Sequence, residues 1–166
     1  MQWRRYRVVS GFLFLASVIG MAFALYLEHV QGLEPCPLCV FQRVGLIALG
    51  VISLIAFIHN PASNTMKRVY ALLGSVGILW SAGVAGRHLW LQHLPADQVP
   101  ACGPGLNYLV EVLPLKAVFE QVLTGSGECA AIDWTFLGQS LPFWSLIFFV
   151  VLALVSVWQL LRKYPA

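Results

Sequence analysis

The chain has 166 residues, of which 59% are hydrophobic and only 10% are charged, and its mean hydropathy is +0.78. Because about a quarter of the residues are charged in a typical soluble domain, this composition excludes a water-soluble globular protein. The net charge of +3 is small and scattered, which argues against nucleic-acid binding. We expect a single membrane domain over residues 1–166.

Four apolar segments are long enough to cross a bilayer, because about 20 residues at roughly 1.5 Å each span about 30 Å of hydrocarbon. The first follows Arg4, Arg5 and Arg7, so a cleavable signal peptide is its alternative. Its apolar run is longer than the core of a signal peptide, and we expect an uncleaved helix. The fold class predicted is an all-α, four-helix transmembrane bundle. The predicted spans are residues 8–27, 38–58, 69–90 and 141–161.

Two cysteines, Cys36 and Cys39, form a Cys-x-x-Cys motif at the start of the second span. Proline suits the first position of a helix, so Pro37 predicts a helix that begins there with Cys36 as its N-cap. The positive end of the helix dipole favours a thiolate, the reactive form of cysteine. Arg43 follows Cys39 by one helical turn and shares its face. These features predict a redox dithiol site at a membrane surface.

Half of a zinc site is the alternative interpretation of this motif, because two thiolates at this spacing also bind zinc. The sequence contains no second Cys-x-x-Cys and no His-x-x-His, so we expect no metal ligands. A zinc-stabilised structural membrane protein, with the four cysteines as ligands, stays open as an alternative function.

The third span, residues 69–90, ends with Arg87 and His88. Ionisable side chains at membrane depth are costly and therefore indicate function, although an arginine can also extend to the interface. Arg43 and His88 lie near the same end of their spans, so we expect them to converge beside Cys39. A cation and a hydrogen-bond donor next to an electron-donating thiolate suit a quinone carbonyl. Small residues in this span favour close helix contact: Gly74, Gly77, Ser81 and Gly83.

The long loop at residues 91–140 contains the other two cysteines, Cys102 and Cys129. Its residues 100–105 are rich in proline and glycine, which predicts an extended, mobile segment. Apolar residues recur at helical spacing in Leu115–Leu123 and predict a short amphipathic helix, which either lies on the membrane or packs on protein. A Gly-Ser-Gly stretch follows this helix and predicts a flexible stalk for Cys129.

Basic residues cluster at one side of the predicted spans, and by the positive-inside rule both termini are expected to be cytoplasmic. The loops at residues 28–37 and 91–140 then lie in the outer compartment, and all four cysteines face it. An oxidising compartment favours disulfides, of which three pairings are possible, and purely structural disulfides are an alternative. The basic residues of the cytoplasmic side are Arg4, Arg5, Arg7, Lys67, Arg68, Arg162 and Lys163.

A specific set of motifs accompanies the four predicted spans and extends over nearly the whole chain. The motifs are Glu34-Pro35-Cys36-Pro37-Leu38-Cys39, Gln42-Arg43, Ala101-Cys102, Gly127-Glu128-Cys129-Ala130, Trp134-Thr135-Phe136-Leu137-Gly138 and Pro142. In this combination the chain resembles the DsbB-type disulfide bond formation proteins, which are thiol:quinone oxidoreductases of the inner membrane of Gram-negative bacteria.

The resemblance implies that Cys102 and Cys129 form a disulfide that oxidises a soluble periplasmic, thioredoxin-like partner of the DsbA type. Cys102 would be held in the mixed disulfide with this partner. The resemblance further implies that electrons pass to Cys36 and Cys39, and that Cys39 reduces ubiquinone, or menaquinone, beside Arg43.

Two further expectations concern His88 and Cys129. His88 aligns with a histidine that the family places near the quinone. Glu128 is expected to raise the pKa of the Cys129 thiol and to make it a poorer leaving group, whereas access favours Cys102 as the sulfur that the partner attacks. The alternative enzyme is a vitamin-K-epoxide-reductase-like protein, in which the Cys-x-x-Cys lies late in the chain and the loop pair early, the reverse of the order here.

Overall fold

The computed structural model describes residues 2–95, 97–103 and 106–162, with side chains from Tyr6 onward except that of residue 107. Part of the predicted mobile segment, Pro104 and Gly105, lies outside the described residues. The same holds for part of the predicted basic cluster, namely Lys163 and the side chains of Arg4 and Arg5.

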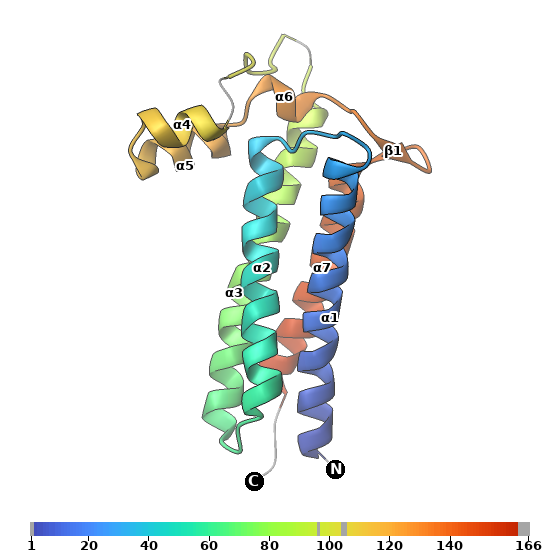
Figure 1. Cartoon of the computed structure of the whole chain (residues 1–166), viewed down its shortest axis with the longest axis vertical. Helices are drawn as coiled ribbons and strands as arrows, with labels where there is room; N and C mark the ends of the chain where they lie inside the picture. Colours follow the sequence, from blue (N-terminus) through green and yellow to red (C-terminus); the bar gives the residue numbers. More distant parts are fainter. Residues whose placement is uncertain (1, 96, 104–105, 163–166) are drawn as a thin grey trace.

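Within the described residues, four long helices run side by side, and each is long and apolar enough to cross a membrane (Figure 1). The predicted all-α, four-helix transmembrane fold is therefore confirmed. The four helices are α1 (Gln2–His29), α2 (Pro37–His59), α3 (Asn64–Gln92) and α7 (Leu141–Leu161). Each predicted span lies within the matching helix, and the first three helices extend beyond the apolar run at one or both ends.

The short elements gather at one end of the bundle, opposite the end where α1 begins and α7 ends (Figure 1). The long loop therefore covers a single end of the molecule. Its elements are α4 (Leu106–Val112), α5 (Leu115–Thr124), α6 (Gly127–Ala130), β1 (Thr135–Phe136) and β2 (Gln139–Ser140). The strands form one small antiparallel hairpin, in which Thr135 pairs with Ser140.

Helix α2 begins and ends where the sequence predicts. Cys36 is its N-cap, with extended backbone, and Pro37 occupies the first helical position, where a missing N–H costs nothing. At the other end Asn60 adopts the left-handed conformation at φ 40°, and Pro61 follows. Proline also starts α7, where Pro142 lies in the first turn.

Helix α3 holds the bundle together, because it packs along both α2 and α7, while α2 also packs along α1. Helices α1 and α7 contact each other only a little. The central core has side chains from all four helices, among them Leu13, Leu49, Ile78 and Leu152, each at most 1% exposed. The weak contact between α1 and α7 leaves room between them for the cavity described below.

Helices α2 and α3 approach each other backbone to backbone at Gly45. A Cβ at this position would collide with the carbonyl oxygen of Gly77 and with Ser81 Oγ. Ser81 Oγ in turn donates a hydrogen bond to the carbonyl of Gln42 at 2.7 Å. The predicted contact through small residues is confirmed at Gly77 and Ser81, whereas Gly83 has no described atom within 4 Å of an added Cβ.

The predicted amphipathic helix is confirmed as α5. Its Val118 and Val122 are buried against Leu38 and Leu91 of the bundle, so this face packs on protein. The expectation of a flexible stalk before Cys129 is wrong, because the cysteine lies in α6 and is only 1% exposed. Helix α4 and the β1–β2 hairpin were not predicted, since both are too short to give a periodic pattern.

Replacing Gly45 by alanine should destabilise the fold, because a backbone carbonyl of α3 cannot move away from the added methyl group. We expect a loss of about 1–3 kcal/mol in the free energy of unfolding, the usual cost of overpacking. Denaturant unfolding of the purified protein in detergent micelles measures this quantity. Gly83→Ala is the matched control and should unfold like the parent chain; equal stabilities of the two variants would contradict the close approach.

Candidate functional site

The two cysteines of the Cys-x-x-Cys motif lie at the N-terminus of α2, at the end of the bundle covered by the long loop. Their sulfur atoms are 3.2 Å apart, and both are partly buried thiols. Cys36 is the N-cap and Cys39 lies in the first turn, so both sulfurs face the positive end of the helix dipole. The local placement predicted from Pro37 is confirmed.

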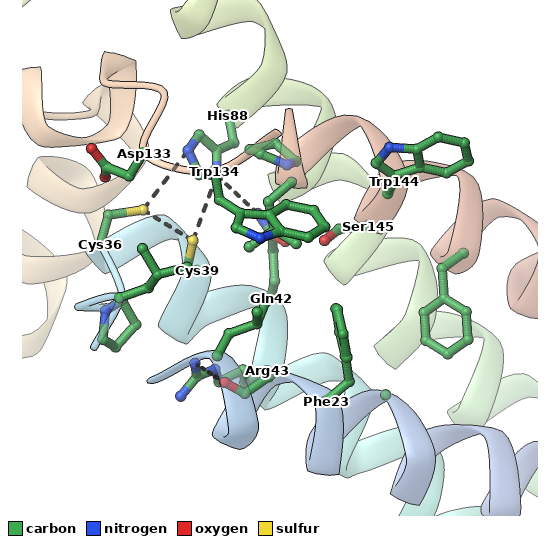
Figure 2. Close-up of a pocket in the computed structure, with 18 of the residues that line it drawn as sticks. Phe23, Cys36, Cys39, Gln42, Arg43, His88, Asp133, Trp134, Trp144 and Ser145 are labelled. Atoms are coloured by element: carbon green, nitrogen blue, oxygen red, sulfur yellow. Dashed lines mark hydrogen bonds between the residues drawn. The ribbon is translucent and has the colours of Figure 1, made fainter. Parts of the chain in front are cut away.

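His88 of α3 lies across from both sulfurs (Figure 2). Its Nε2 is 3.8 Å from Cys36 Sγ, and its Nδ1 is 3.8 Å from Cys39 Sγ. Gln42 Nε2 approaches the same Nδ1 at 3.3 Å, a hydrogen bond that the imidazole accepts in the tautomer whose proton is on Nε2. Nδ1 can therefore accept a proton from the Cys39 thiol. The expected convergence of His88 with Cys39 is confirmed.

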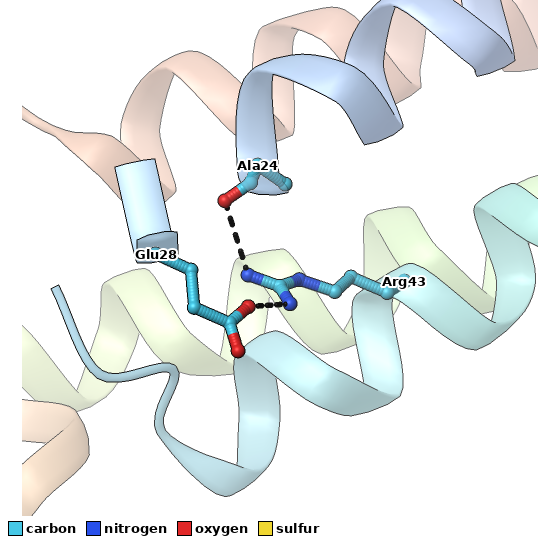
Figure 3. A network of polar contacts seen from close by, with 3 residues as sticks. All are labelled: Ala24, Glu28 and Arg43. Atoms are coloured by element: carbon cyan, nitrogen blue, oxygen red, sulfur yellow. Dashed lines mark hydrogen bonds and ion pairs between the residues drawn. The ribbon is translucent and has the colours of Figure 1, made fainter. Parts of the chain in front are cut away.

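Arg43 lies one turn beyond Cys39 and forms an ion pair with Glu28 of α1 (Figure 3). Its Nη2 also donates to the carbonyl of Ala24 at 3.4 Å. The guanidinium is thus held against the end of α1 with its charge balanced. Sequence reasoning missed Glu28, although a carboxylate at the end of the first apolar run was a signal that could have found it.

Arg87 has a different role from its neighbour His88. Its Nε and Nη2 donate to the carbonyls of Leu123 and Thr124, at 3.1 and 2.9 Å, and its guanidinium lies over the ring of Trp90 at 4.1 Å. These carbonyls end α5 and lack partners within that helix. Arg87 therefore fastens the end of α5 to α3, just before the segment that carries Cys129.

The loop cysteines differ sharply in exposure. Cys129 is buried beside the Cys-x-x-Cys motif, whereas Cys102 is exposed. A hydrogen bond with Cys36, together with burial, raises the pKa of the Cys129 thiol. The expected direction of this shift is confirmed, but its source is Cys36 and burial, because Glu128 is not among its causes. Three sulfurs thus meet at one place, and the fourth faces outward.

The exposed cysteine nevertheless lies close to the segment of its buried counterpart. Gly127 N–H donates to the carbonyl of Ala101 at 3.3 Å, and a Cβ at Gly127 would come within 3.0 Å of Cys102 Sγ. Glycine at position 127 is therefore what allows the two loop segments to touch. The disulfide between Cys102 and Cys129 that the family resemblance implies requires the two segments to lie close together, although both cysteines are free thiols here.

A cavity of about 400 Å³ opens beside Cys39 and His88 (Figure 2). Its walls are mainly apolar and come from α1, α2, α7 and the loop, whereas Gln42 and Arg43 line its polar side. Trp134 of the loop also lines it and meets Phe23 of α1 edge to face, with ring centroids 6.4 Å apart. The size and the mainly apolar lining suit a small, largely apolar molecule.

Replacing Arg87 by alanine should expose Cys129, because the end of α5 loses two hydrogen bonds to α3. At about 1 kcal/mol each, their loss should speed alkylation of Cys129 in the reduced protein about tenfold or more. Peptide mass mapping measures this rate. The alkylation rate of Cys129 should also keep rising with pH through the alkaline range. Only the thiolate reacts, and the raised pKa leaves much of this thiol protonated at the start of that range. Lys116→Ala, which removes an exposed cation of α5, is the control; equal rates in both variants would contradict this role.

Comparisons with known proteins identify the family of this chain. The sequence model of the family "Disulfide bond formation protein DsbB" matches residues 6–159. Disulfide bond formation protein B of Acinetobacter baumannii is 72% identical over 96% of this chain and 94% of its own length. Its namesakes in Acinetobacter baylyi and Psychrobacter sp. are 72% and 54% identical, over 99% and 97% of this chain and 96% of their own lengths. The chain therefore belongs to the DsbB family of disulfide bond formation proteins.

Proposed function

We propose that this chain re-oxidises a periplasmic, thioredoxin-like dithiol protein of the DsbA type by passing its electrons to a membrane quinone. The main support is the apolar cavity beside Cys39, because a lipid-soluble acceptor can reach that thiol from the bilayer. Family membership supports a redox role in disulfide formation. It also favours this function over a vitamin-K-epoxide-reductase-like activity.

The first step of the proposal takes place at Cys102. In a chain with a Cys102–Cys129 disulfide, a partner thiolate attacks Cys102, and the electron pair of the broken bond goes to Cys129. The second partner thiolate then releases Cys102 and closes the partner's disulfide, so that two electrons have entered the chain. Exposure decides the point of attack, because Cys102 is open to solvent and Cys129 is 1% exposed.

The second step moves the electron pair to the Cys-x-x-Cys motif. The Cys129 thiol lies within hydrogen-bonding reach of Cys36, so attack on a Cys36–Cys39 disulfide needs little movement. Thiol exchange restores the Cys102–Cys129 disulfide and leaves the other pair as two thiols. His88 Nδ1, 3.8 Å from Cys39 Sγ, can then accept the thiol proton of Cys39.

The third step delivers two electrons and two protons to an acceptor, ubiquinone or menaquinone, while Cys36 and Cys39 return to the disulfide. A quinone supplies a two-electron, two-proton acceptor that dissolves in the membrane. Arg43 and His88 line the cavity. They would donate hydrogen bonds to the carbonyl oxygens of the quinone, where negative charge develops. Glu28 holds Arg43 at this position.

The basic residues support an orientation for this relay. Lys67 and Arg68 lie near the start of α3, at the end of the bundle remote from the cysteines, and Arg162 follows α7 at the same end. By the positive-inside rule we propose that this end and both termini face the cytoplasm of a bacterial inner membrane. The cysteines then face the periplasm.

The order of attack can be tested by trapping. A partner variant that retains a single cysteine is used, and this cysteine is first converted to a mixed disulfide with thionitrobenzoate. The Cys129→Ser chain should form a covalent complex through Cys102, visible on a non-reducing gel, whereas Cys102→Ser should form little, because Cys129 is buried. A complex through Cys129 alone would reverse the order.

Replacing Arg43 by histidine should weaken use of the acceptor. A hydrogen bond to a charged group is worth about 1.5–3 kcal/mol, so the KM for quinone should rise about 10- to 100-fold. Quinone absorbance, followed with a reduced partner and a quinone series, measures this change. Formation of the mixed disulfide should be unaffected, and Arg68→His, at the far end, should behave like the parent. An unchanged quinone dependence in a folded Arg43→His chain would refute the assignment.

A further inference from the structure

The end of the bundle near the long loop contains a group of soft ligand atoms whose arrangement suits a metal ion as well as the electron relay. The sulfurs of Cys36 and Cys39 and a ring nitrogen of His88 all lie within 4.8 Å of one another. Cys36 is the N-cap of α2 and Cys39 lies in its first turn, whereas His88 comes from the far end of α3, 49 residues further along the chain than Cys39. We propose that the dithiol form of this group binds a soft divalent cation such as Zn²⁺.

The spacing of the three ligand atoms fits tetrahedral coordination. Zinc bonds of about 2.3 Å to sulfur and 2.0–2.1 Å to nitrogen place neighbouring ligand atoms roughly 3.3–3.8 Å apart. Cys36 Sγ is 3.8 Å from Nε2, which is within this range, whereas Cys39 Sγ is 3.8 Å from the other nitrogen, Nδ1. The two sulfurs are 3.2 Å apart and would separate by about half an ångström on binding. Only one nitrogen of the imidazole can bind the ion. We assign Nε2, which faces Cys36, as the ligand, because Nδ1 is then free for a second contact.

Cys129 supplies the fourth ligand. It is 1% exposed and packs in the same buried cluster as Cys36 and Leu38, and a small movement of α6 would bring its sulfur into the group formed by Cys36, Cys39 and His88. A site of three thiolates and one imidazole is a common zinc ligand set. Cys102 is exposed and stays outside this group. This ligand set therefore differs from the four-cysteine site that a zinc-stabilised structural membrane protein, the alternative function given above, would require.

Gln42 provides the second contact that a metal-bound histidine usually makes. It is 5% exposed and its amide faces His88 Nδ1 at 3.3 Å. When Nε2 binds the ion, Nδ1 carries the ring proton and donates it to the amide oxygen, once the amide has turned over.

Binding of the cation is an acid–base reaction and not a redox step. Each bound thiol releases a proton to solvent, and no electrons are transferred. A Cys36–Cys39 disulfide has no thiolates to offer, so only the reduced chain binds the ion. The bound ion in turn prevents this disulfide from forming. On the proposed function, the cation is therefore a reversible inhibitor that holds the chain in its reduced state.

Cobalt titration of the full-length chain in detergent micelles, reduced with a phosphine under argon, tests the site without quinone or partner. Co²⁺ reports a tetrahedral site by intense visible bands and reports thiolate ligands by near-ultraviolet charge-transfer bands. We expect one Co²⁺ per chain, displaced by Zn²⁺, and no such bands in the oxidised chain. Weak bands typical of octahedral cobalt in the reduced chain would overturn the site.

Substitutions identify the ligands. His88→Ala and the nearly isosteric Cys39→Ser should each weaken Co²⁺ binding about tenfold or more. His93→Ala, which removes an exposed histidine of the same helix, is the matched control and should bind like the parent. Cys129→Ser should lower the charge-transfer intensity by one thiolate; unchanged intensity would exclude it as the fourth ligand. Equal affinities of His88→Ala and His93→Ala would overturn the proposal, whatever the chain does with quinone.

Discussion

The close packing of α2 against α3 is the constraint on which the rest of the structure depends. Gly45 brings the two backbones together, and Ser81 of α3 donates to the carbonyl of Gln42 in α2 at 2.7 Å. The side chain of the same Gln42 reaches His88, which lies two turns beyond Ser81 on α3. One residue thus joins the helix contact to the imidazole, and the register of α3 decides where His88 meets the sulfurs.

A second contact determines which sulfur faces the solvent. Arg87 joins the end of α5 to α3 through two hydrogen bonds, and the segment that follows returns Cys129 to the N-terminus of α2. The contact between Gly127 and the backbone at Ala101 keeps the Cys102 segment nearby but outside. Neighbouring residues, Arg87 and His88, therefore serve different parts of the molecule, one the loop and the other the thiols.

Charge at the cavity is balanced before any ligand enters. Glu28 pairs with Arg43, so the cation lies at the bilayer edge without the full cost of an unpaired charge. The limited contact between α1 and α7 leaves a mainly apolar cavity beside this pair, and the thiols of Cys36 and Cys39 and the imidazole of His88 are part of its lining. The same thiols and imidazole are the ligand atoms of the proposed metal site, because redox cysteines pack here against a histidine.

The sequence by itself determined the four helices, the start of α2 at Pro37, the amphipathic α5 and the family, because each depends on local apolar periodicity, on proline or on motif spacing. It also indicated the residues of the site: Cys36, Cys39, Cys102, Cys129, Arg43 and His88. Only the tertiary structure decided which of them meet. The pairing of Arg43 with Glu28, the burial of Cys129 against Cys36 and the contact of Gln42 with His88 join residues far apart in the chain. Such contacts arise from helix register and from the loop's return path, which no local pattern in the sequence encodes.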